Sequence, residues 1–141
     1  MTAPDPIEIG SMKKRVLLID DEDGFTRILK LNLERTGNYE VRVENWGGAA
    51  APAAREFKPH ILLLDVILPP PSFGGDIAAL FKADPELKQI PIVFLSATVS
   101  PGRVIEHDGI ISGYPFIAKP ATTEEVINGI EKYARSSVDS G

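Results

Sequence analysis

Short runs of apolar residues alternate along the chain with segments in which apolar residues recur at helical spacing. The runs at 16–19, 61–64 and 92–95 are uninterrupted, which is typical of strands buried on both faces of a parallel sheet. In 39–43, apolar residues instead alternate with charged ones, which indicates a strand nearer the sheet edge. A further strand is predicted over 114–118, which brings the total to five.

Each predicted strand is followed by a segment with helical character. The predicted helices cover 25–36, 49–57, 76–83, 103–107 and 122–133. In the third of these, we expect Ile77, Leu80 and Phe81 to face the core. Thr122 and Glu125 have the spacing of a capping box, which predicts the start of the last helix.

The regular alternation of strand and helix predicts an α/β fold, a doubly wound (βα)5 arrangement. Its five-stranded parallel sheet carries helices on both faces, and right-handed crossovers favour the strand order 2-1-3-4-5. The 141 residues suit one domain. We assign 13–135 to that domain, 1–12 to a disordered start or a cloning tag, and 136–141 to a disordered tail.

Composition narrows the possible environments and partners. The chain is 43% hydrophobic and 25% charged, as in ordinary globular proteins, and the lack of cysteine fits a reducing compartment and a cytoplasmic location. The net charge of −5 argues against a direct nucleic-acid partner, and no apolar run is long enough to span a membrane. We expect both histidines, His60 and His107, to lie on the surface.

Polar side chains follow four of the five predicted strands. These residues are Asp20 and Asp21, Asp65, Ser96, and Lys119. In open α/β sheets, ligands bind beyond the carboxyl ends of the strands, so this edge is the expected site. The first and third strands are neighbours, and three carboxylates therefore converge and repel one another. A hard divalent cation with oxygen ligands resolves that repulsion, and Mg²⁺ is the predicted ion.

A hydroxyl and an ammonium opposite the carboxylates complete a set that suits phosphoryl transfer. Metal and lysine can neutralise the phosphoryl oxygens while a carboxylate serves as the covalent acceptor. Each residue alone has a simpler explanation, since an aspartate after a strand is commonly a turn former or helix cap. Their coincidence at one sheet edge favours the functional interpretation.

Four motifs resemble those of the receiver domain of two-component response regulators, a flavodoxin-like fold. The motifs are Val16–Glu22, Ile61–Asp65 with Pro69 four residues later, Phe94–Ala97, and Phe116–Pro120. The resemblance extends from about Lys13 to Arg135. It implies a signalling domain rather than an enzyme, with at most self-phosphorylation from phosphodonors and slow autodephosphorylation. Because no effector domain follows residue 135, we expect a stand-alone member that acts through an unknown downstream protein.

The resemblance also implies residue roles. Asp65 would accept a phosphoryl group from a phosphohistidine on a sensor histidine kinase or phosphotransfer protein. The implied Mg²⁺ ligands are Asp20, Asp21, Asp65 and the backbone carbonyl of Ile67. Ser96 and Lys119 would contact the phosphoryl oxygens. Ser96 would then shift and Phe116 turn inward, changing the face made by the fourth helix, fifth strand and fifth helix. The Lys119–Pro120 bond is expected to be cis.

One feature near the expected acceptor differs from the usual family pattern, and another bears on the lifetime of a phosphorylated form. The loop with Pro69–Pro71 is longer and stiffer than usual, which we interpret as length variation in a surface loop. The aliphatic Ile67, two residues after Asp65, would hinder a hydrolytic water. Our hypothesis is a longer-lived phosphorylated form than in receivers with a polar residue there.

Two other classes of protein are weighed against the receiver. A haloacid-dehalogenase-type phosphatase would use Asp21–Asp23 as its nucleophile motif, with Ser96 and Lys119 in its next two motifs. It would leave Asp65 unexplained, and its final acidic pair would have to be Glu124 and Glu125 in the capping box. A receiver-shaped module that is never phosphorylated is the second alternative, but it would not need the intact acidic set.

Overall fold

A single parallel sheet organises the computed structural model, which describes residues 13–68, 74–97, 110–111 and 113–134. The parallel strands are β1 (Lys14–Ile19), β2 (Tyr39–Glu44), β3 (Ile61–Asp65), β4 (Ile92–Ser96) and β6 (Tyr114–Ala118). Their order is β2-β1-β3-β4-β6, which confirms the predicted order 2-1-3-4-5. A short strand that was not predicted, β5 (Ile110–Ile111), pairs antiparallel with β6 at the edge.

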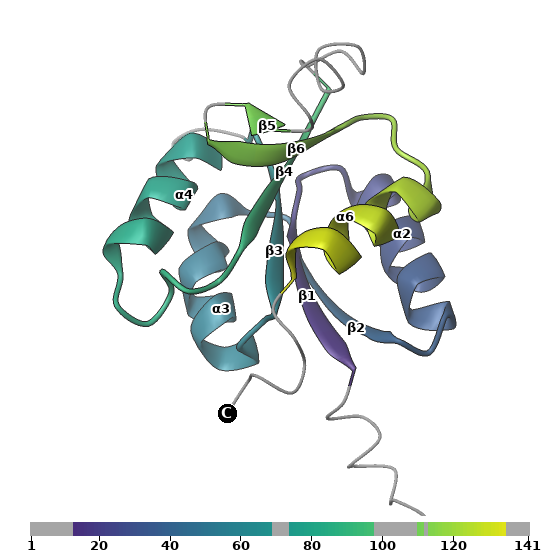
Figure 1. Cartoon of the computed structure of the whole chain (residues 1–141), viewed down its shortest axis with the longest axis horizontal. Coiled ribbons are helices and arrows are strands. Elements are labelled where there is room, and N and C mark those ends of the chain that lie inside the picture. The colour runs from purple at the N-terminus through teal and green to yellow at the C-terminus, as the bar shows by residue number, and fades with distance from the viewer. Residues whose placement is uncertain (1–12, 69–73, 98–109, 112, 135–141) are drawn as a thin grey trace, which may run out of the picture.

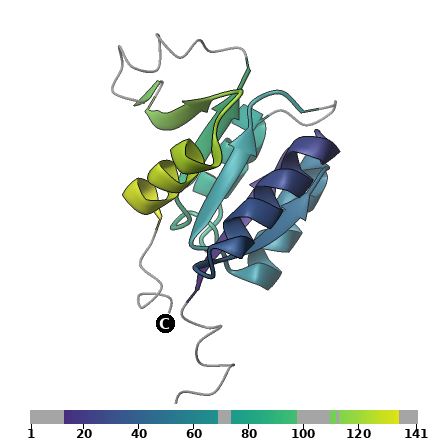
Figure 2. The same ribbon diagram turned by 90° about the vertical axis from the view of Figure 1, so that its right-hand side faces the viewer.

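Helices cover both faces of the sheet (Figure 1). The described helices are α2 (Asp23–Arg35), α3 (Ala50–Phe57) after a 3-10 turn at Gly47–Ala49, α4 (Gly74–Ala83) and α6 (Thr123–Tyr133). Helices α2 and α6 pack on one face and α3 and α4 on the other, as the turned view in Figure 2 also shows. The predicted helix at 103–107, His107, the Pro69–Pro71 loop and the terminal segments lie outside the described residues.

The uninterrupted apolar runs are explained by burial on both faces of the central strands. Every residue of β3 and β4 is buried, as is the apolar part of β1. Successive side chains point to opposite faces, so Leu17 and Leu62 join the layer under α3 and α4, while Leu18 and Leu63 join the layer under α2 and α6. A polar residue within these runs would therefore be buried whichever face it took.

Local signals end one helix and begin another as predicted. Gly37 follows α2 with a φ of 81°, a left-handed conformation that glycine adopts without strain. At α6, the Thr122 hydroxyl accepts the Glu125 N–H at 3.1 Å, and the Glu125 carboxylate accepts the Thr122 N–H at 2.9 Å. These reciprocal bonds confirm the predicted capping box.

Two predicted placements are wrong. Leu80 is 52% exposed rather than facing the core, because the buried face of α4 is centred between Ile77 and Ala78 and Leu80 lies to one side of it. His60 is 1% exposed rather than on the surface. Its backbone N–H donates to the Arg15 carbonyl at 2.8 Å, and its Nδ1 accepts the Arg15 N–H at 2.9 Å, so it extends the ladder between β1 and β3.

Across the stretches of chain that the structure describes, none of the helices has both the length and the apolar character needed to cross a membrane.

Candidate functional site

Parallel pairing brings the predicted acidic residues together at the carboxyl edge of the sheet. Ile19 of β1 lies opposite Leu64 of β3, so the residues that come next, Asp20 and Asp65, are neighbours. Oxygen atoms of Asp20, Asp21 and Asp65 all lie within 4.8 Å of one another. Asp20 and Asp65 are buried, whereas Asp21 is exposed and borders solvent.

Asp20 is held by hydrogen bonds from three directions. Its Oδ1 accepts the backbone N–H of Glu22 at 2.9 Å, and its Oδ2 accepts the Lys119 ammonium at 2.7 Å. The Asn45 amide donates to its backbone carbonyl at 2.7 Å. These contacts fix the carboxylate at the end of β1.

Asp65 has far less support for its negative charge. Burial raises its pKa from 3.8 to about 6, and repulsion from Asp20 adds to that rise. The Lys119 ammonium counteracts it only partly, from 3.9 Å. The Ile67 N–H lies 3.3 Å from the Asp65 Oδ1 and is a further weak donor. Asp65 is therefore a carboxylate that a nearby positive charge would stabilise.

Lys119 reaches this cluster from the end of β6. Its backbone N–H donates to the Ser96 carbonyl at 2.9 Å, and its bond to Pro120 is cis, as predicted. Burial alone would lower the pKa of Lys119, but hydrogen bonds to Asp20 and Glu22 outweigh burial and raise the pKa. The ammonium also lies 4.7 Å from the centre of the Phe25 ring.

The start of α4 lies directly against the end of β3. The Gly74 N–H donates to the Val66 carbonyl at 2.9 Å. A Cβ at position 74 would lie 2.4 Å from the Asp65 carbonyl oxygen, closer than side-chain atoms approach backbone. Glycine at this position therefore permits the close contact between α4 and the end of β3.

The two predicted switch residues lie on neighbouring strands. Ser96 is buried at the end of β4, and Phe116 is half-buried on β6 opposite Phe94. The Phe94 and Phe116 rings are 5.1 Å apart, and Tyr114 packs edge-on against Phe94 at 5.2 Å. Phe94 of β4 thus packs against two aromatic side chains of β6, Phe116 in the middle of the strand and Tyr114 at its start.

The donor set fits a hard cation. All three side chains offer carboxylate oxygens, the ligand type that Mg²⁺ prefers, and the spacing of these oxygens allows one ion to contact all of them. Burial raises the pKa of Asp65 and repulsion from Asp20 adds to the rise, so a cation placed among these carboxylates would favour the ionised form of Asp65.

Three contacts in the site were missed by sequence reasoning. The carboxylate of Glu22 accepts the Lys119 ammonium at 3.0 Å, the Phe25 ring faces that ammonium, and Asn45 contacts Asp20. Glu22 and Lys119 are 97 positions apart, so no local pattern signals their pairing. The proximity of Glu22 to the carboxyl end of β1 was the one available indication.

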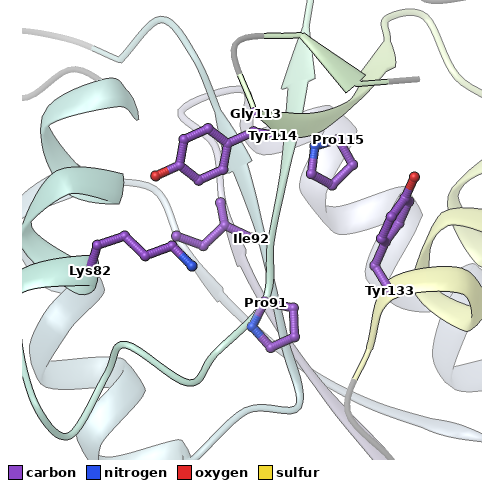
Figure 3. Close-up of a pocket in the computed structure, with 7 residues that line it drawn as sticks. All are labelled: Lys82, Pro91, Ile92, Gly113, Tyr114, Pro115 and Tyr133. Atoms are coloured by element: carbon purple, nitrogen blue, oxygen red, sulfur yellow. The ribbon is translucent and has the colours of Figure 1, made fainter. Parts of the chain in front are cut away.

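A separate pocket of about 420 Å³ opens at the opposite end of the strands (Figure 3). It lies where β4 and β6 begin, with Ile92 and Tyr114 in its lining and the side chains of Lys82 and Tyr133 on either side. None of the acidic site residues lines it. The acidic cluster, rather than this pocket, brings together the predicted site residues.

Comparison with known proteins agrees with this geometry. A family model described as the response regulator receiver domain matches residues 16–131. The chain belongs to the response regulator receiver domain family. As a receiver domain of two-component systems, it is a signalling domain of the kind that interacts with histidine kinases or phosphotransfer proteins. The flavodoxin-like receiver fold predicted from sequence is confirmed.

Individual receivers resemble this one at moderate identity. The polar-differentiation response regulator DivK of Brucella anthropi is 29% identical over 124 residues, covering 86% of this chain and 97% of DivK. The DNA-binding response regulator MtrA of Mycolicibacterium smegmatis is 29% identical over 132 residues, covering 93% of this chain and 55% of MtrA. The chain thus spans about half the length of MtrA and several other curated relatives that it matches.

A solved structure shows the same likeness in three dimensions. A response regulator from Chloroflexus aurantiacus superposes with a TM-score of 0.70 at 27% identity, covering 85% of this chain and 96% of that one. The phosphatase alternative loses its basis, since the family match is to receivers and Asp23 pairs with Arg27 instead of joining the acidic cluster.

Proposed function

We propose that this receiver domain takes a phosphoryl group from a phosphohistidine onto Asp65, with Mg²⁺ as cofactor. The donor is a sensor histidine kinase or a phosphotransfer protein. The observation that carries this proposal is the position of Asp65, a buried carboxylate at the end of β3 with two further carboxylates and one ammonium around it. We assign residues 13–135 to the functional domain.

Phosphoryl transfer needs an in-line nucleophile and compensation of the phosphoryl charge. A carboxylate oxygen of Asp65 forms the new P–O bond as the P–N bond of the donor histidine breaks. The histidine nitrogen leaves with the electron pair of that bond and is then protonated. Lys119 and the Ser96 hydroxyl contact the phosphoryl oxygens.

Asp20, Asp21, Asp65 and the backbone carbonyl of Ile67 would hold Mg²⁺, which would supply positive charge to the phosphoryl oxygens. The chain's own contribution is to hold the carboxylate oxygens of Asp20 and Asp65 in position. Asp20 is fixed by its three hydrogen bonds, and the contact of Gly74 with Asp65 sets where β3 ends.

Phosphorylation would be transmitted through Ser96 and Phe116. As the Ser96 hydroxyl moves to the phosphoryl group, Phe116 turns inward and changes the face that β6 and α6 form with the segment before them. The packing of Phe116 on Phe94 supports this route, because a change in one ring must be accommodated by the other. A downstream protein would bind this altered face.

Phosphate mapping tests the proposal. Purified protein is incubated with acetyl phosphate and Mg²⁺, and the labile phosphoryl group is located by mass spectrometry after reductive trapping. We expect it on Asp65, and we expect Asp65→Ala to reduce incorporation to background. Asp76→Ala is the matched control, because Asp76 is an exposed acid in the first turn of α4 outside the cluster.

The same experiment distinguishes the alternatives. A phosphoryl group on Asp21 or Asp23 would support a phosphatase-type mechanism. Absence of both phosphorylation and beryllofluoride binding would support an interaction module that is never phosphorylated. Phosphotransfer profiling against candidate histidine kinases, with Asp65→Ala as control, then identifies the donor.

A further inference from the structure

The Lys119 ammonium is shared among carboxylates that hold it with different strength. It lies 2.7 Å from Asp20, 3.0 Å from Glu22 and 3.9 Å from Asp65. Only the first two distances are hydrogen bonds. In this state, the lysine is therefore bonded to two residues that flank the acceptor and not to the acceptor itself.

The two bonded carboxylates differ in how readily they can release the lysine. The Asp20 side chain is fully buried, so it can release the ammonium only where another cation, such as the proposed Mg²⁺, takes its place. The Glu22 side chain is 60% exposed, so water can replace the ammonium there at little cost. When Lys119 turns toward an anion on Asp65, Glu22 is the partner that it loses.

We propose that Glu22 is a positioning residue that restrains Lys119 away from Asp65, and so sets how tightly the site holds a phosphoryl group. The inference rests on the proposed phosphoacceptor function of Asp65. The bond between Lys119 and Glu22, which is present in the free state, must break before the ammonium can contact the phosphoryl oxygens. Weakening this restraint makes the anion-bound state more favourable.

The geometry allows the restraint to be changed without disturbing its surroundings. Asp20 is held by the backbone N–H of Glu22 and not by its side chain, so substitutions at position 22 leave that bond intact. The Phe25 ring, 4.7 Å from the ammonium, remains as a neighbouring surface in every variant. The effect of the side chain can therefore be measured by itself.

The test measures beryllofluoride affinity by calorimetry in saturating Mg²⁺. We expect Glu22→Gln to tighten binding about two- to fivefold, the range expected for loss of one exposed ion pair. Glu22→Asp keeps the charge but is one methylene shorter, and we expect it to tighten binding as well because it no longer reaches Lys119. Asp23→Asn is the matched control, since Asp23 is the adjacent exposed acid and pairs with Arg27 instead.

Two results would overturn the inference. If Asp23→Asn tightens binding as much as Glu22→Gln does, the effect is one of general charge. If Glu22→Asp behaves as wild type, reach to Lys119 is irrelevant. A second readout needs no phosphate analogue: the ammonium proton signal of Lys119 in ¹H–¹⁵N spectra should broaden in both Glu22 variants, because its protons exchange faster after losing one acceptor.

These readouts separate the inference from the function on which it rests. Wild-type protein that fails to bind beryllofluoride contradicts the phosphoacceptor function, whatever happens at position 22. Wild-type protein that binds normally, with Lys119 signals and affinities unchanged in both Glu22 variants, contradicts the positioning role alone.

Discussion

The two ends of β1 differ in the balance between acidic groups and the hydrogen-bond donors around them. At its start, one carboxylate receives two donors: Glu131 accepts the Lys14 ammonium at 2.8 Å and the Tyr39 hydroxyl at 2.6 Å. At its end, several carboxylates share one ammonium, and Asp65 stands 3.9 Å from it. The first end has donors in excess of acids, and the second has acids in excess of donors.

The pKa values follow this difference. Hydrogen bonds from Lys14 and then Tyr39 lower the pKa of Glu131, whereas burial and then Asp20 raise the pKa of Asp65 to about 6. The start of β1 therefore contributes to folding, because its ionised state is preferred in the folded protein. At the end of β1, the buried Asp65 carboxylate opposes folding at neutral pH, which is consistent with the cation and the phosphoryl group that we propose for this site.

Neutralising Asp65 has the largest expected effect on this balance. A pKa difference of one corresponds to about 1.4 kcal/mol, so the rise from 3.8 to about 6 corresponds to about 3 kcal/mol of destabilisation at pH 7. We expect Asp65→Asn, in chelator, to raise the free energy of unfolding by about this amount. Urea denaturation measures it, with Asp76→Asn as the control.

The pH dependence tests the sign of the effect that the Asp65 charge has on the free energy of unfolding. Between about pH 4 and 6, folded Asp65 binds more protons than unfolded Asp65, so the contribution of Asp65 to stability falls as pH rises through this window. The advantage of Asp65→Asn over wild type should therefore vanish as pH falls from 7 to about 4. An advantage that persisted at pH 4 would have to come from packing and would contradict the electrostatic explanation.

Adding Mg²⁺ is the next largest change. An ion that binds only the folded protein stabilises it by about 2.7 kcal/mol at a hundred times its dissociation constant. We expect a gain of this order for wild type in thermal or urea unfolding, and a clearly smaller one for Asp65→Asn. Equal gains in both proteins would place the ion outside the Asp20–Asp21–Asp65 cluster.

At the start of β1, a smaller effect is expected. Tyr39→Phe removes the hydroxyl that donates to Glu131, and we expect it to lower the free energy of unfolding by about 1 kcal/mol. Phosphorylation of Asp65 by acetyl phosphate should be unchanged. A change in phosphorylation would show that the two ends of β1 are coupled and not independent.

The smallest expected effect is kinetic. Ile67 is exposed, its N–H lies 3.3 Å from Asp65 Oδ1, and our hypothesis is that its aliphatic side chain hinders an attacking water. We propose that Ile67→Asn shortens the lifetime of phosphorylated Asp65 by a factor of about two to five, equivalent to at most about 1 kcal/mol in the barrier. An unchanged decay rate in purified protein with Mg²⁺ would contradict this hypothesis.

The carboxyl edge of the sheet was predictable because strand ends are readable from sequence. An acid, a serine or a lysine that follows an apolar run must lie at that edge once the strands are parallel, as Asp65 and Lys119 do. The parallel strand order was predictable for the same reason, because uninterrupted apolar runs separated by helices allow few other arrangements.

Side-chain contacts between distant segments were not predictable. The bond between Glu22 and Lys119 depends on two flexible side chains that meet only after β1 and β6 are in place. Leu80 was misplaced because the buried face of α4 includes Gly74, Ala78 and Phe81, and at about 100° per residue Leu80 lies beside that face and not on it. His60 was misplaced because backbone pairing beyond the apolar run cannot be seen in side-chain pattern alone.

Two adjacent glycines carry very different freedom to vary. Any side chain at Gly74 would place its Cβ 2.4 Å from the Asp65 carbonyl oxygen. A Cβ at Gly75 would have nothing within 4 Å. Natural drift or a mutant library can therefore explore position 75 widely, whereas a side chain at position 74 displaces the backbone of Asp65. At the start of α4, a position that requires glycine is thus followed directly by one that can accept many residues.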